Sequence, residues 1–77
     1  MNKDNSETLV EIGSTYRHEG GILYRPDSIL LNATNYESGV APSPIVVYTQ
    51  LGDGKYPAGT QWVREISDFI AHFQKTS

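Results

Sequence analysis

Short runs of apolar, β-branched and aromatic residues alternate with glycine- and proline-rich turns along most of the chain. Each run has the length of a β-strand and is too short for a helix that is stable in isolation. The runs predict strands over residues 15–18, 22–25, 29–34, 45–51 and 60–64. The two glycines at 20–21 predict a tight hairpin turn between the first two of these strands, because glycine adopts positive φ at little cost.

Other turn residues predict where the chain leaves the sheet. Residues 26–28 predict a turn, because proline fixes φ and aspartate and serine can bond nearby backbone. Residues 35–44 are the least regular stretch and predict an exposed loop that carries Tyr36 near its start. Residues 52–59 predict a second long turn region. The run at 45–51 is the richest in β-branched and aromatic residues, which indicates a central strand covered on both faces.

The pattern changes from strand to helix near the C-terminus. Phe69, Ile70 and Phe73 have the spacing of one apolar helix face, and Ser67 is a favourable N-cap. These features predict a helix over residues 67–75. Because so short a helix is unstable alone, we expect its two phenylalanines to close the open side of the sheet.

The elements together predict a mainly β fold, a small and partly open β-barrel of about five strands with one short C-terminal helix. Residues 1–12 are expected to form a flexible or edge N-terminal segment, and residues 13–77 a single barrel domain. The turn density excludes a helix bundle, and the chain is too short for a doubly wound α/β fold.

Composition narrows the classes of function. The 77 residues include six Lys and Arg against nine Asp and Glu, a formal charge of −3, which disfavours a nucleic-acid partner. The absence of cysteine excludes disulfides, thiolate metal sites and a cysteine nucleophile. No apolar run is long enough to cross a membrane, and the first residues do not read as a signal peptide, so we expect a cytoplasmic protein with no membrane partner.

Several motifs together resemble a known family. They are the segments 16–18 (Tyr-Arg-His), 20–21 (Gly-Gly), 23–24 (Leu-Tyr), 46–48 (Val-Val-Tyr) and 62–64 (Trp-Val-Arg). In this combination the chain resembles, over roughly residues 13–73, the domain-of-unknown-function 1653 family of small bacterial and phage proteins. The resemblance implies an SH3-like barrel with a short C-terminal helix, and it implies no activity.

The chain departs from that family in two places. Glu65 stands where the family usually has proline, so the exit from the last strand is expected to differ from that of the family. The loops at 35–44 and 55–59 are longer than usual, which suggests the phage-like branch and a role in acting on a host protein or a small signalling ligand.

Few residues predict catalytic chemistry. The chain has two histidines, His18 and His72, and no nucleophile triad, phosphate loop or metal-ligand spacing, so we predict no catalytic residue, metal or cofactor. His18 is expected to hydrogen-bond backbone at the hairpin turn. A small hydrolase-like enzyme that uses His18 as acid or base is the alternative.

The aromatic residues suggest a binding surface, since five Tyr and one Trp exceed what so small a barrel can enclose. One interpretation places Tyr48 and Trp62 in the core and the other rings over loops. The other predicts a site for a protein partner or a small anionic or aromatic ligand, formed by Tyr16, Arg17, His18, Tyr24, Tyr36, Tyr56 and Arg64. A single-stranded nucleic-acid binder is a further alternative, and unpaired sheet edges allow a homodimer.

Overall fold

The computed structural model describes residues 10–34 and 36–76 of the chain. Its elements are β1 (Tyr16–His18), β2 (Leu23–Asn32), the 3-10 helix η2 (Tyr36–Ser38), β3 (Ser43–Gln50), β4 (Gln61–Glu65), α1 (Ile66–His72) and β5 (Phe73–Lys75). The prediction of a mainly β fold with one short C-terminal helix is therefore confirmed.

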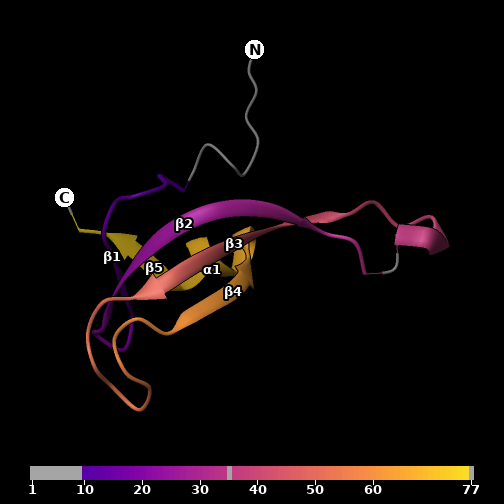
Figure 1. Cartoon of the computed structure of the whole chain (residues 1–77). Coiled ribbons are helices and arrows are strands. Elements are labelled where there is room, and N and C mark those ends of the chain that lie inside the picture. The colour runs from indigo at the N-terminus through magenta and orange to yellow at the C-terminus, as the bar shows by residue number, and fades with distance from the viewer. Residues whose placement is uncertain (1–9, 35, 77) are drawn as a thin grey trace.

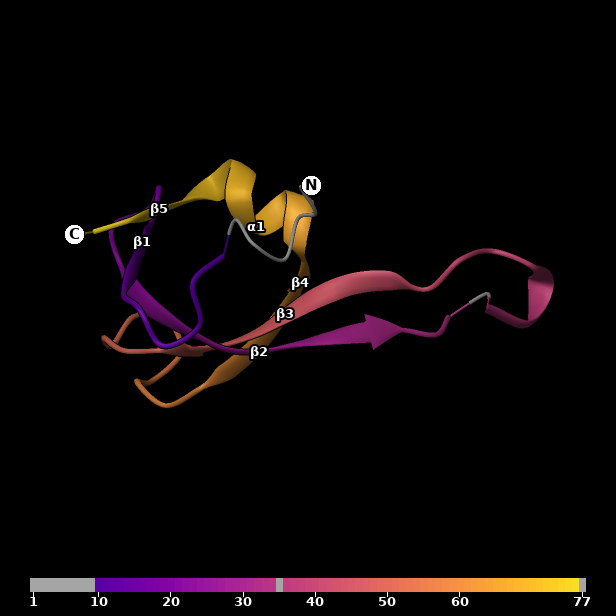
Figure 2. The ribbon, with the colours of Figure 1, turned by 90° about the horizontal axis from the view of Figure 1, so that it is seen from above.

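The strands form one antiparallel sheet in the order β4-β3-β2-β1-β5. The helix α1 connects β4 at one end of this order to β5 at the other end, on one side of the bent sheet (Figures 1 and 2). Because β4 and β5 do not pair, the sheet stays open between them, as the partly open barrel predicts. We call the side that packs against α1 the concave face.

The core lies between α1 and the concave face. Phe69 and Phe73 stack with ring centroids 4.0 Å apart, and Tyr48 contacts both rings edge-on. The phenylalanine pair therefore covers the open side of the sheet, as predicted. The buried apolar residues of this core are Val10, Tyr16, Val46, Tyr48, Ile66, Phe69 and Phe73.

The prediction of two separate strands at 22–25 and 29–34 is wrong. The structure has a single strand β2 through residues 26–28, where the sequence predicts a turn, with a β-bulge between Pro26 and Ser28. The irregularity is absorbed by long-range contacts, because the N–H of Gly13 donates to the Pro26 carbonyl and Thr49 bonds to Asp27. A proline without an N–H is tolerated at such a bulge.

The predicted helix at 67–75 is also corrected. The helix begins at Ile66 and ends at His72, and its N-cap is Glu65, which makes no side-chain cap hydrogen bond. The residues after His72 form β5 instead, because they pair with β1. Ile66 occupies the buried helix face, whereas Ile70 is 39% exposed.

The N-terminal boundary lies earlier than residue 13. Val10 is buried in the core, and the N–H of Glu11 donates to the Tyr16 hydroxyl at 2.9 Å. Residues 10–12 form no strand, and the rest of the predicted segment 1–12 lies outside the described residues. In the described part of the chain, no helix has the length and apolar character needed to cross a membrane.

Candidate functional site

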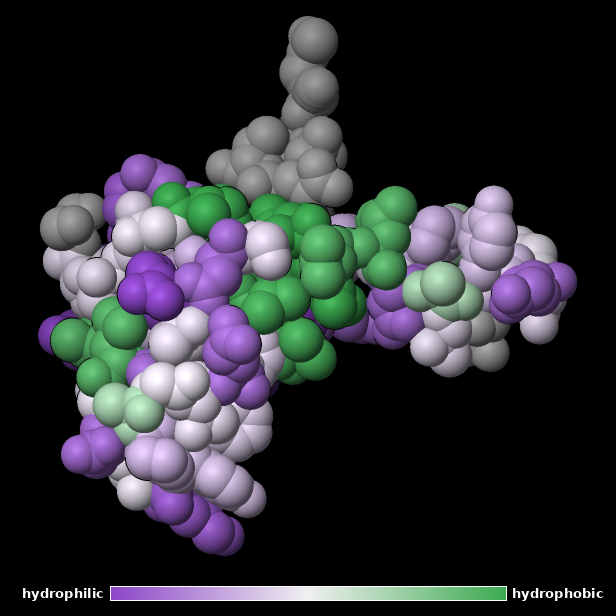
Figure 3. Space-filling view, in the orientation of Figure 1, coloured by the Kyte–Doolittle hydropathy of each residue, from purple (hydrophilic) through white to green (hydrophobic). Residues whose placement is uncertain are grey.

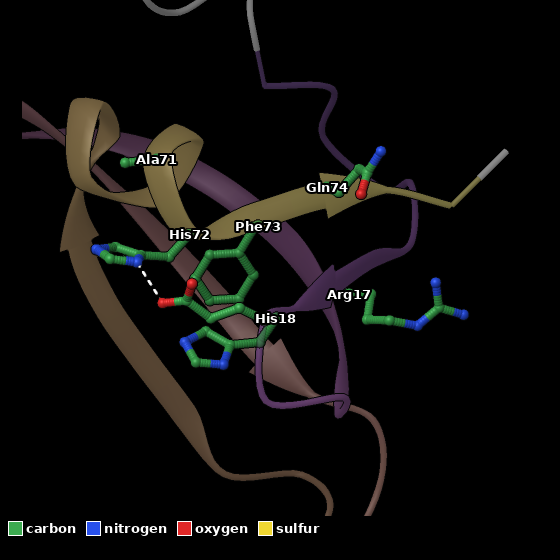
Figure 4. A pocket seen from close by; sticks show the side chains of 7 residues that line it. Arg17, His18, Ala71, His72, Phe73 and Gln74 are labelled. Atoms are coloured by element: carbon green, nitrogen blue, oxygen red, sulfur yellow. Dashed lines mark hydrogen bonds and ion pairs between the residues drawn. The ribbon is translucent and has the colours of Figure 1, made fainter.

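The structure has a pocket of about 400 Å³ where the β1–β2 turn meets the C-terminal end of α1 and the start of β5 (Figure 4). Two of the residues predicted for the site, Arg17 and His18, line it. In Figure 4 the side chain of Arg17 extends away from the two imidazoles. The remaining lining residues are Glu19, Ala71, His72, Phe73 and Gln74.

His18 is held by the hairpin turn that follows it. Its Nδ1 accepts a hydrogen bond of 2.9 Å from the N–H of Gly20, which assigns the ring proton of the neutral imidazole to Nε2. A side chain at position 20 would place its Cβ 3.2 Å from Nδ1, so glycine permits this close approach. Gly21 completes the turn with a φ of +108°, a conformation that favours glycine. The predicted backbone hydrogen bond of His18 is therefore confirmed.

The second histidine lies between two carboxylates. His72 Nδ1 is 2.5 Å from Glu19 Oε2, and its Nε2 is 3.4 Å from Asp68 Oδ1. The His18 and His72 rings are stacked with centroids 6.4 Å apart. Both ring nitrogens of His72 therefore lie near carboxylates of the same chain, with Nδ1 at hydrogen-bond distance from Glu19.

Arg64 contacts both Asp68, which lies beside His72, and Tyr48 in the core. Its Nε donates to the Tyr48 hydroxyl at 2.9 Å, its Nη1 lies 2.5 Å from Asp68, and its guanidinium lies 5.3 Å from the centroid of the Phe73 ring. Burial opposes the charge of Arg64, but the contacts with Tyr48 and Asp68 outweigh it and raise the arginine pKa. Burial raises the pKa of Tyr48, and the nearby guanidinium only partly offsets this effect. The Arg64 guanidinium therefore stabilises the fold through its contacts with Tyr48 and Asp68.

Two of the predicted tyrosines are part of the folded interior. Tyr16 is buried with its ring edge-on to Phe69. Tyr24 is partly buried and contacts His18, Tyr48 and Phe73, with centroids 6.3, 5.4 and 5.4 Å away. Tyr24 thus packs against two residues that line the pocket, His18 and Phe73, whereas Tyr16 packs in the core against the helix.

The other two predicted tyrosines lie on separate loops. Tyr36 is exposed in η2, at the far end of the extension formed by β2 and β3 (Figures 1 and 2). Tyr56 is exposed in the β3–β4 connection and contacts the partly buried Trp62 edge-on at 5.1 Å. Trp62 in turn donates from Nε1 to Gln50 Oε1. The seven predicted residues therefore do not form one continuous surface.

Among the described residues, no group of three or more His, Cys, Asp or Glu side chains is placed to hold a metal ion. The pocket offers two imidazoles, a carboxylate and an arginine, of which His72 pairs with Glu19 and His18 accepts a backbone hydrogen bond.

A second surface was missed by the sequence reasoning, namely the side of the sheet that faces away from α1. Alternation from buried Val46 places Ile45 and Val47 on this outer side. The register adds Val63 beside Val47 and Leu30 beside Ile45. We call Leu30, Ile45, Val47 and Val63 the apolar face.

The apolar face is exposed at its two flanking residues, Leu30 and Val63, whereas Ile45 and Val47 between them are partly buried. Val63 is 60% and Leu30 53% exposed, and a continuous hydrophobic area extends over β2 and β3 (Figure 3). Its neighbours in the register are polar, with Ser28 beside Val47 and Glu65 beside Ile45. Residues 45–48 are apolar at every position, so the alternation that defines this face is not visible in the sequence.

Comparison of the chain with family models, curated proteins and solved structures finds no match. The resemblance to the domain-of-unknown-function 1653 family stays a prediction.

Proposed function

We propose that this protein is a small, non-enzymatic binding module that docks a protein partner on its apolar face. The observation that carries the proposal is a group of four neighbouring aliphatic side chains from three adjacent strands, two of them (Leu30 and Val63) exposed and two (Ile45 and Val47) partly buried, all outside the buried core. Contiguous apolar surface of this kind, bordered by polar residues, is typical of protein interaction sites.

Exposed apolar area on the face, and existing side-chain contacts in the pocket, make the apolar face the better candidate for binding a partner. Val63 and Leu30 would each lose most of their water-exposed area on docking, and apolar burial contributes about 25 cal/mol per Å². In the pocket, His72 is paired with Glu19 and lies near Asp68, so a ligand that uses the ring nitrogens of His72 would have to displace these contacts. A partner with an apolar centre and a polar rim fits the face best. A phage origin, a host target and action in the cytoplasm stay predictions of the sequence.

Site-specific photo-crosslinking tests this proposal. We would place benzoylphenylalanine at position 63 in the cell that naturally produces the protein and identify the adducts by mass spectrometry. We expect one reproducible adduct with a different protein, lost when Val47→Lys is added. The matched control is Gln61→Lys, which adds the same charge two residues from Val63 on the same side of β4 and should leave the adduct in place.

The fold of each variant would be checked by its circular dichroism spectrum and unfolding midpoint. The proposal is wrong if no adduct forms, if the adduct persists in Val47→Lys, or if it has twice the mass of this chain. Each of these results would mean that the apolar face does not recognise another protein.

A further inference from the structure

The edges of the sheet differ in how they are protected from pairing with another strand. Edge strands are commonly protected by charged residues, by shortness or by a bulge. The edge strand β4 carries Arg64 and Glu65, and the edge strand β5 has three residues and ends in Lys75. Both strands therefore have features that disfavour further pairing.

The outer half of β2 is a third edge, and it has no such protection. β1 pairs with β2 only at Leu23 and Tyr24, and Gly13 reaches Pro26. From residue 28 to residue 32, β2 pairs with β3 on its inner side and has no backbone partner on its outer side among the described residues. Figure 2, which looks onto this edge, shows no described segment over it.

The composition of this edge favours strand pairing. The segment Ser-Ile-Leu-Leu-Asn at 28–32 contains no charge and no proline, and the bulge of β2 lies at its beginning, between Pro26 and Ser28. Leu30 and Leu31 are 53% and 62% exposed. An exposed, apolar and unprotected edge is a ready template for another strand.

We propose that the outer edge of β2 pairs with the same edge of a second copy of this chain, antiparallel and with Leu30 opposite Leu30 at a two-fold axis. In this register Ile29 of each copy faces Leu31 of the other, and Ser28 faces Asn32. Apolar residues thus face apolar residues, polar residues face polar residues, and no like charges meet. In a dimer with this register, each residue from 28 to 32 faces a residue of the same polarity in the second copy.

The backbone is consistent with this register. Pro44 has no N–H, so its pair with Leu31 cannot exchange two ladder hydrogen bonds. Alternation then directs the N–H and C=O groups of Leu31 and Ile29 outward, where the two copies would bond them to each other. Leu30 falls at the non-hydrogen-bonded position, where facing side chains are closest.

Packing also improves in the dimer. Ile29 packs against the core on the concave side, and Leu31 of the other copy would cover its outer flank. Leu30 belongs to the apolar face, so the apolar faces of the two copies would join across the axis. A five-residue strand pair is at the small end of specific interfaces, and we expect a dissociation constant in the micromolar range.

Single-cysteine variants test the register directly, since the chain has no cysteine of its own. Under mild oxidation we expect Leu30→Cys to form a covalent dimer several-fold faster than Val63→Cys, which lies on the same side of the sheet but away from the axis. Equal rates for the two variants would overturn the proposal.

Sedimentation equilibrium tests the dimer without a crosslink. We expect the unmodified chain to dimerise, Leu30→Lys to be monomeric because two cations meet at the axis, and the control Val63→Lys to dimerise as before. A chain that is monomeric up to millimolar concentration, or a dimer that survives Leu30→Lys, would overturn the proposal. Neither result bears on the photo-adduct at position 63, so the proposed function and the dimer fail independently.

Discussion

Asp27 illustrates how a single residue stabilises a part of the structure that its local sequence does not predict. It lies in the bulge of β2, accepts a hydrogen bond from the Thr49 hydroxyl and pairs with Arg25 at 2.8 Å. Burial by itself would raise the pKa of this carboxyl, but the hydrogen bonds from Thr49 and Arg25 outweigh it, so the pKa is lowered. The charged form of Asp27 therefore stabilises the folded state.

This assignment predicts a pH-dependent loss of stability on the substitution Asp27→Asn. Because the folded-state pKa lies below the unfolded one, the stabilisation is present above about pH 4 and is lost as the pH falls through the folded-state value. At pH 7 we expect Asp27→Asn to lower the free energy of unfolding by about 1–3 kcal/mol, with a smaller difference at acidic pH.

Urea denaturation at a series of pH values measures this effect. Thr49→Val removes the hydroxyl donor at nearly constant volume and is the matched partner for a double-mutant cycle. If the two substitutions are additive at pH 7, the hydrogen bond between Thr49 and Asp27 is not the source of the stabilisation.

At the scale of elements, β2 and β3 are longer than the core requires. The two strands continue as a two-stranded extension past the last register pair with β4. In the described part of the connection, residues 33–34 and 36–42, the backbone hydrogen bonds are short-range. Its apolar side chains Tyr36 and Val40 are 57% and 53% exposed. The connection therefore adds little packing to the fold.

Because Asn32 and Ser43 are direct register partners, a two-residue Asn-Gly turn can replace residues 33–42. We expect the shortened chain to unfold with a free energy equal to that of the natural chain or higher by about 1 kcal/mol, since the loop to be closed is shorter. A ten-residue Gly/Ser segment in the same place is the control for sequence at constant length. A loss of more than about 2 kcal/mol in thermal or urea unfolding of the short form would show that the connection contributes packing.

At the scale of the whole molecule, one helix joins the two ends of the sheet and provides the core with its central ring. Phe69 is fully buried and contacts Phe73, Tyr16 and Tyr48, which come from β5, β1 and β3. A single side chain thus connects the edge strand β5 and its neighbour β1 to β3, on the other side of β2.

We therefore expect Phe69→Ala to cost about 3–5 kcal/mol. That is a large share of the roughly 4–12 kcal/mol typical of a chain of this length. The neighbouring substitution Ile70→Ala, at a position 39% exposed, should cost less than about 1 kcal/mol and is the matched control. Urea unfolding would contradict this account of the core if the two variants lost similar stability.

The sequence allowed prediction of the strands that contain strong local signals. β3 and β4 lie within one or two residues of their predicted positions, and the Gly-Gly hairpin after His18 is present. The unbroken β2 was missed because Pro-Asp-Ser at residues 26–28 is compatible both with a turn and with a β-bulge. The bulge is distinguished by contacts from Gly13 and Thr49, which lie far away in the sequence.

The candidate site was predicted less well. Arg17 and His18 do line a pocket, but Tyr16 and Tyr24 are taken up by the interior, and Tyr36 and Tyr56 lie far apart. Ring count alone does not say which side of a strand each ring occupies. The apolar face was missed because residues 45–48 are apolar throughout, so alternation could not be assigned before the register was known.

Local chemistry by itself determined the β-rich class, the hairpin at the two glycines, and a C-terminal helix with a buried phenylalanine. These follow from propensity, turn residues and spacing within a few positions. Tertiary contacts decided that Phe73–Lys75 join β1 as a strand, that β2 continues through its bulge, and that one side of the sheet stays exposed. The physical reason is that each of these outcomes depends on backbone partners and packing from residues far away in the chain.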